Sequence, residues 1–320
     1  LELARGRRRE ALKLALALVP LAAWFLLLRW QTGLWLGDPA FAEYNLWGVL
    51  HPARWALQLP KRFYQLAIAN FHWVATLLVV VAWRRGAFSA PAEARRTLAV
   101  FLVAHAGFLS VIGGASLSRY LLPAFPLLFL LAADAATGLR WPARNATLLG
   151  LPLAFVACGF WNPPYPYPYE DNLAYADFVR LHRDAAPLLE HFPPGTRILT
   201  AWPATDELSH PWLGYVRRPL EIVPLEDFSR QEMARASAQR FEVLLLFSRQ
   251  WRPEWFDRFP RLAVLQARYF RSRQQAPPEW IREQLGLERR VSTARRGQWL
   301  EIWTKPGIPF PGPSQVAVLH

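Results

Sequence analysis

Cysteine is almost absent from this 320-residue chain: Cys158 is the only one, and it lies in an apolar run. A single cysteine excludes an intrachain disulfide framework and a metal site made of several thiolates. We therefore interpret Cys158 as a small buried hydrophobic residue. A glycine-rich phosphate loop after a strand is also missing, so nucleotide binding is not predicted and no cofactor is expected.

The sequence also lacks zinc-finger spacing and any platform of alternating basic and aromatic residues, although its net charge is +13 and its pI is near 10.6. Arginine supplies most of this charge, and many arginines stand at the ends of apolar runs. A strongly basic chain can bind nucleic acid or anionic lipid. The placement of the arginines favours membrane lipid as the partner and argues against nucleic acid.

Long apolar runs are present, but all lie before about residue 162, and the mean hydropathy of +0.07 averages two unlike halves. A bilayer core of about 30 Å requires roughly 20 apolar residues in a helix. Five segments come near this length, and we predict a membrane-spanning helix in each: 11–28, 66–83, 97–116, 121–139 and 146–161. Pro123 and Pro126 predict a kinked or unwound entry to the fourth.

Clusters of arginine orient these segments. They precede the first segment, bracket the second and third at 84–96, and separate the fourth from the fifth at 140–144. Because cytoplasmic loops are enriched in Lys and Arg, these regions are predicted to lie inside. Residues 29–65, the turn near 117–120 and everything after 162 are then predicted to lie outside. The expected location is the bacterial inner membrane, as a multi-pass protein with an extracytoplasmic C-terminal domain.

The outer segment 29–65 is too apolar and aromatic for a free loop, and 44–57 is typical of an amphipathic helix in the membrane interface. Cations on the outer side run against the usual bias, which indicates an anionic partner such as a polyprenyl phosphate. Anchoring to lipid headgroups is the alternative. Arg119 and Tyr120 stand in the outer turn beside this segment. The predicted substrate-binding residues are Asn45, His51, Arg54, Lys61, Arg62, Arg119 and Tyr120.

Three further groups of ionisable residues are weighed. His105 and Asp134 lie at predicted membrane depth, where such groups are costly and often functional. Asp206, Glu207 and His210 have a spacing that invites a metal site, although a capped helical turn explains it equally well. No metal is assigned.

After a Pro/Tyr linker at 162–170, the remaining sequence alternates strand and helix patterns. Helices are predicted at 171–190, from 229 and at 278–285, and strands at 197–202, 220–225, 243–247, 261–270 and 298–304. Such alternation predicts a small α/β layer domain. The fold class is therefore a multi-span α-helical membrane domain at 1–161 followed by a small α/β extracytoplasmic domain at 171–320.

The segments GDPAFAEYN and SRYLLPA, with a last span followed by an outer α/β domain, resemble the GT-C membrane glycosyltransferases. The resemblance is to bacterial relatives of protein mannosyltransferases and aminoarabinose transferases, and it covers most of the chain. It implies transfer of a sugar from a polyprenyl-phosphate donor to an acceptor on the outer face.

The resemblance also implies an acidic general base in the first outer loop of the family. Asp38 and Glu43 lack the adjacent acidic pair expected there, so no catalytic residue is assigned and the base is expected upstream of Leu1. The chain is then interpreted as a C-terminal portion of such a glycosyltransferase. Two alternatives are a non-catalytic lipid or polysaccharide transport component and a membrane-anchored glycan-binding module.

Overall fold

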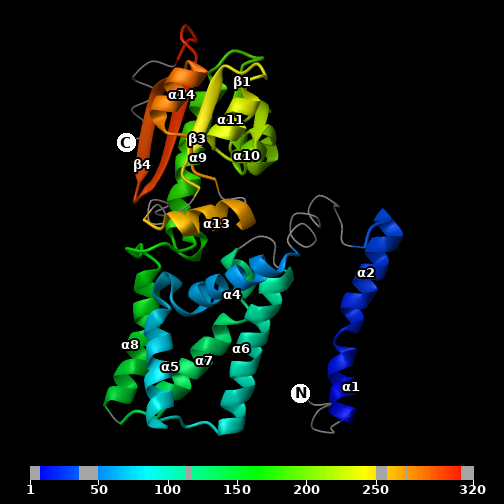
Figure 1. Cartoon of the computed structure of the whole chain (residues 1–320), viewed down its shortest axis with the longest axis vertical. Coiled ribbons are helices and arrows are strands. Elements are labelled where there is room, and N and C mark those ends of the chain that lie inside the picture. The colour runs from blue at the N-terminus through cyan, green and yellow to red at the C-terminus, as the bar shows by residue number, and fades with distance from the viewer. Residues whose placement is uncertain are drawn as a thin grey trace.

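A computed structural model describes residues 8–35, 50–112, 117–140, 142–249, 258–270 and 273–310 of the chain. The first half is helical and the second half is an α/β unit, with α13 lying between the sheet and α4 (Figure 1). The helical half contains α1 (Arg8–Leu16), α2 (Val19–Thr32), α4 (Pro52–Ala67), η2 (Ala69–Phe71), α5 (Trp73–Arg85), α6 (Ala92–Ile112), η3 (Ser118–Leu121), α7 (Phe125–Thr137) and α8 (Ala143–Cys158).

The prediction of five membrane-spanning helices, and with it a multi-span membrane domain, is wrong. Within the described part of the chain, only α6 is long and apolar enough to cross a membrane. Helices α5 and α7 have 13 residues each, α2 has 14 and α8 has 16. At about 1.5 Å per residue, these helices are shorter than a bilayer core of about 30 Å.

The apolar runs are interrupted by breaks in the helical backbone. The first run is divided at Leu18, and Pro20 stands in the first turn of α2. The second is divided between α4 and α5, where Asn70 and Phe71 adopt left-handed φ values of 50° and 66°. The unwound entry predicted for the fourth run is confirmed, because η3 and a turn precede α7.

Two ionisable residues of the helical half serve its packing. The Asp134 carboxylate accepts hydrogen bonds from the backbone N–H groups of Ser89 and Ala90, at 3.0 and 2.7 Å, and so closes the loop after α5. His105 Nε2 lies 2.9 Å from the carbonyl oxygen of Tyr120 and so joins α6 to η3. Helices α5 and α7 meet closely, since a Cβ atom on Gly138 would lie 2.1 Å from the carbonyl oxygen of Ala87.

The α/β half contains η4 (Tyr169–Asp171), α9 (Ala174–Glu190), β1 (Arg197–Ala201), α10 (Ala204–Ser209), η5 (Pro211–Leu213), β2 (Glu221–Leu225), α11 (Arg230–Ala236), β3 (Val243–Phe247), α13 (Pro260–Phe270), α14 (Pro278–Leu285), β4 (Glu288–Arg295) and β5 (Gln298–Thr304). The sheet has the order β2-β1-β3-β5-β4. Strands β2, β1 and β3 are parallel, whereas β5 and β4 are antiparallel to their neighbours. All five residues of the central strand β3 are buried.

Most elements of the α/β half lie where the sequence predicts them. The segment at 261–270 differs, because it forms helix α13 and not a strand. Its sequence contains good helix formers such as Leu, Ala, Gln and Arg, and Pro260 stands at its first position. Strand β4 was not predicted, since its sequence is mostly polar and its inward-facing alternation consists of only two residues, Val291 and Thr293.

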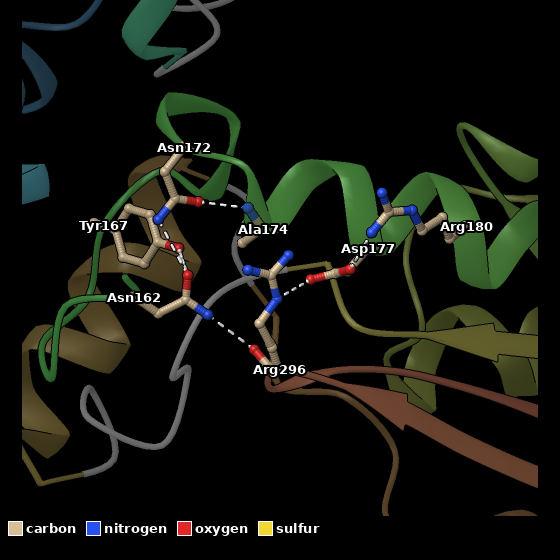
Figure 2. A network of polar contacts seen from close by, with 7 residues as sticks. All are labelled: Asn162, Tyr167, Asn172, Ala174, Asp177, Arg180 and Arg296. Atoms are coloured by element: carbon tan, nitrogen blue, oxygen red, sulfur yellow. Dashed lines mark hydrogen bonds and ion pairs between the residues drawn. The ribbon is translucent and has the colours of Figure 1, made fainter. Parts of the chain in front are cut away.

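The β4–β5 hairpin is tied to the linker by a polar network (Figure 2). Asn162 donates to the carbonyl oxygen of Arg296 at 2.9 Å, and its own side-chain oxygen accepts from Tyr167 and Asn172. The buried carboxylate of Asp177 binds two guanidinium groups, with Arg296 Nε at 2.5 Å and an Arg180 nitrogen at 3.1 Å. The network therefore joins the end of α8, α9 and the hairpin.

We expect Asp177→Ala to lower the free energy of unfolding by about 1–3 kcal/mol, because it removes a buried acceptor shared by two arginines. Asp184→Ala is the matched control: Asp184 pairs with Arg295 of the same hairpin at 2.9 Å but is more exposed. Its loss should be about 1 kcal/mol or less. Chemical denaturation followed by tryptophan fluorescence measures both, and equal losses would contradict this role for Asp177.

Candidate functional site

Helix α4 turns polar side chains inward. Arg54, Gln58, Arg62 and Gln65 are all buried, whereas Leu59 is exposed. The spacing of these residues places them on one face of the helix. A surface helix normally buries its apolar face, so α4 is oriented by polar contacts. We call Arg54, Lys61 and Arg62 the α4 cation row.

The middle of this row is bound to the segment before η3. An Arg62 side-chain nitrogen donates to the carbonyl oxygen of Leu117 at 2.9 Å and to Gln65 Oε1 at 3.2 Å. Burying a guanidinium is costly unless its N–H groups find acceptors. These hydrogen bonds therefore hold α4 against the turn that carries Arg119.

Helix α13 covers the other side of the row. Arg54 Nε donates to the carbonyl oxygen of Tyr269 at 3.1 Å, and its guanidinium lies 5.3 Å from the centroid of the Phe270 ring. The Lys61 ammonium lies over the same ring at 4.9 Å. Cations at this distance are attracted by the electrons of an aromatic face. The α/β half thus supplies one wall of the site.

The cations of the row repel one another. Burial, followed by the neighbouring charges of Arg62 and Arg54, lowers the pKa of Lys61 to about 8. Burial, followed by the charge of Arg54, lowers the pKa of Arg62 to about 10. Within the described residues, Lys61 has no carboxylate as an ion-pair partner. An anion bound here would relieve this repulsion.

The opposite side of the site is formed by η3 and η4. Arg119 pairs with Glu170 at 3.7 Å, and the Ser118 hydroxyl donates to the carboxylate of Asp171. The Asp171 backbone oxygen accepts from Asn70 at 3.0 Å. Burial raises the pKa of Asp171 to about 6, against the opposing effect of the Ser118 hydrogen bond. Both turns are therefore locked together beside the row.

The structure brings most of the predicted substrate-binding residues together. Arg54, Lys61 and Arg62 lie along α4, and Arg119 and Tyr120 lie in η3, which packs on α4. His51 has a structural role, since its Nδ1 accepts from Ala53 N at 3.2 Å and caps α4. Its ring also meets that of Tyr269 at 5.4 Å. Asn45, Asp38 and Glu43 fall outside the described residues.

Several residues of the site were missed by sequence reasoning: Gln58, Gln65, Ser118, Asp171 and Phe270. Gln58 and Gln65 share the helical face of Arg54 and Arg62, so their spacing is a signal that was available. The sequence offers Asp171 or Asn172 as the N-cap of the helix at 171–190, but the N-cap position of α9 is Leu173. The Asn172 side chain accepts from Ala174 N at 2.8 Å, whereas the Asp171 side chain accepts from Ser118. The contact between α4 and α13 joins residues 215 positions apart and leaves no local signal.

The metal hypothesis for Asp206, Glu207 and His210 finds no support in the geometry. Among the described residues, no three His, Cys, Asp or Glu side chains are placed to hold a metal ion. His210 instead contacts its own helix, with Nδ1 3.1 Å from the carbonyl oxygen of Asp206. Glu207 is buried and paired with His182.

Comparison with known proteins adds no family: no protein-family model, no curated protein and no solved structure matches this chain. The function must therefore be argued from the site itself. Its geometry would suit an anion, because three cations lie on one helix, Arg119 lies in η3 packed on that helix, and the Phe270 ring lies 4.9 Å from the Lys61 ammonium.

We expect Phe270→Ala to raise the pKa of Lys61 above about 8, because water then reaches the ammonium and burial is its main source of shift. Phe270→Leu should keep most of the shift, since an apolar side chain still covers Lys61. The lysines can be methylated with a ¹³C label and titrated by NMR, with the Lys61 signal assigned through Lys61→Arg. An unchanged titration in Phe270→Ala would show that Phe270 does not shield Lys61.

Proposed function

We propose that this chain is part of a membrane-associated glycosyltransferase that takes a sugar from a polyprenyl-phosphate donor on the outer face of the bacterial inner membrane. The observation that carries the proposal is the α4 cation row, where buried cations lower one another's pKa values. Such an arrangement is stabilised by an anion, and guanidinium groups bind phosphate oxygens through paired hydrogen bonds.

The position of the row supports a lipid as the carrier of that anion. Arg62 is bound to Leu117, in the segment that follows α6. Helix α6 is not a core helix, because only 22% of its apolar window is buried. Its exposed side chains include Phe101, Val103 and Phe108. A phosphate held beside the end of a lipid-exposed helix would lie at headgroup level.

The orientation follows from the same contacts. Arg95 and Arg96 stand in the first half of α6, so this end is proposed to face the cytoplasm. The other end leads to η3, which is joined to η4 through the Ser118–Asp171 and Arg119–Glu170 contacts. The α/β half is therefore proposed to lie outside, on the side of the cation row.

In the proposed reaction, an acceptor hydroxyl attacks the anomeric carbon of the sugar. The bond from that carbon to the phosphate oxygen breaks, and the polyprenyl phosphate leaves with the electron pair. Cations at the leaving oxygen stabilise the charge that develops there. The row and Arg119 supply such cations, and the proton of the acceptor hydroxyl is released to solvent water.

Binding of undecaprenyl phosphate to the full chain in nanodiscs tests the anion site. Lys61 loses its charge as the pH rises through about 8, so affinity should fall on the order of tenfold between pH 7 and 9.5. Lys61→Arg should bind with little pH dependence, because its charge persists. Lys61→Met should bind weakly at both pH values.

Arg119→Ala should weaken binding while keeping the pH dependence of the parent. If the affinity for undecaprenyl phosphate is independent of pH, or unaffected by Lys61→Met, the assignment of the α4 cation row as the phosphate site would be overturned. Transfer of radiolabelled sugar from the lipid, lost in Arg119→Ala, would separate the enzyme from a non-catalytic transport or glycan-binding protein.

The membrane orientation can be tested with single cysteines in a Cys158→Ser background. Ala94 lies in the first turn of α6 and Leu122 directly follows η3 beyond its other end, and both residues are exposed. We expect a membrane-impermeant maleimide to label Leu122→Cys in intact spheroplasts, and Ala94→Cys only after lysis. Labelling of both positions in intact spheroplasts would contradict a crossing by α6.

A further inference from the structure

The carboxyl ends of the parallel strands lie at a point where the strand order in the sheet reverses. Strand β1 stands between β2 and β3, so the chain leaves β1 toward one side and returns on the other. In open α/β sheets, ligands bind outside the carboxyl ends of the strands at such a point. Here the strand ends are Ala201 of β1 and Phe247 of β3.

A buried His–Glu pair stands at this edge. His182 Nδ1 on α9 lies 2.5 Å from Glu207 Oε2 on α10, and both side chains are at least nine-tenths buried. The imidazole packs on Phe247 with ring centroids 4.5 Å apart. Its Nε2 is buried and has no partner among the described residues. His182 therefore fixes the orientation of the Glu207 carboxylate, and the Nε2 atom of His182 can still form one hydrogen bond.

Tyrosines surround this carboxylate. Burial, followed by the charge of Glu207, raises the pKa of Tyr215 to about 12, so its hydroxyl stays protonated beside Glu207. Tyr175 stands in the first turn of α9, five residues after Glu170 of η4, which pairs with Arg119 of the cationic site. Its ring stacks on Phe178 at 5.6 Å and remains 39% exposed. Trp202, directly after β1, is also exposed.

We propose that this edge, formed by Tyr175, Glu207 and Tyr215 with His182 behind, binds the hydroxyl groups of a sugar. Sugars offer hydroxyl donors for a carboxylate and a C–H face for an exposed aromatic ring. The inference rests on the proposed function, since it places the sugar unit next to the phosphate held by Arg119 and the α4 cation row.

Two other ligand classes fit this edge poorly. A nucleotide phosphate would meet the negative charge of Glu207, and the segment after β1, WPATDE, has no glycine-rich loop to hold it. A metal ion lacks a third ligand here among the described residues. A neutral polyhydroxyl ligand uses the carboxylate, the phenol groups and the exposed ring together.

The test compares a sugar-bearing lipid with the bare lipid on the full chain in nanodiscs. The probes are undecaprenyl phosphate and its mannosyl, glucosyl and aminoarabinosyl derivatives. We expect at least one derivative to bind about tenfold more tightly than undecaprenyl phosphate, which corresponds to about 1.4 kcal/mol. Tyr175→Leu and Glu207→Gln should remove most of this ratio and leave the affinity for bare lipid within roughly twofold.

Tyr175 is partly exposed, so Tyr175→Leu should fold and can test the inference even if Glu207→Gln unfolds the chain. Equal affinity of the parent for all four lipids would overturn the inference, as would a ratio unchanged in Tyr175→Leu. If instead the proposed function is wrong, neither undecaprenyl phosphate nor any of its sugar derivatives binds. In that case, saturation-transfer NMR with the three corresponding methyl glycosides decides the inference separately, and signal lost in Tyr175→Leu supports it.

Discussion

The inward orientation of the α4 polar face is the constraint on which the rest of the arrangement depends. Arg62 is fully buried, so its guanidinium requires acceptors, and one of these is the carbonyl oxygen of Leu117. Arg54 requires an acceptor as well and finds it in Tyr269 of α13. The burial of two arginines on one helix therefore fixes the positions of Leu117, which follows α6, and of α13 in the α/β half.

The same contacts explain why both the helical half and the α/β half contribute residues to the site. The helical half supplies the cations, and the α/β half supplies the aromatic ring and the carboxylates that limit their exposure. Glu170 pairs with Arg119 at the periphery, whereas the described residues place no carboxylate against Lys61. Among the described residues, a carboxylate therefore pairs with Arg119 and none pairs with Lys61, so an anionic ligand gains most beside Lys61.

Sequence patterns predicted the α/β elements well because each is short and bounded by Pro, Gly or a polar turn, as β1 and β3 are. The spans failed because hydropathy sums over residues and ignores a break in the backbone. Asn70 is one of the few non-glycine residue types that adopt the left-handed conformation readily, but a single Asn within an apolar run did not predict the break between two helices. Arg119 and Lys61 were found because they are charged residues in segments that the sequence predicts to lie outside the membrane. Phe270 was not, because its partners are distant in the chain.

The polar network of Asn162 and Arg296 ties the β4–β5 hairpin of the α/β half to the linker that follows α8, in addition to the contact between α4 and α13 (Figure 2). A domain joined at one point can swivel, but one joined at two keeps a fixed angle to its support. The β4–β5 hairpin therefore forms a rigid connection between the end of α8 and the sheet. The angle between the sheet and the helical half is then set at the hairpin turn, where Arg296 also pairs with Asp177 of α9.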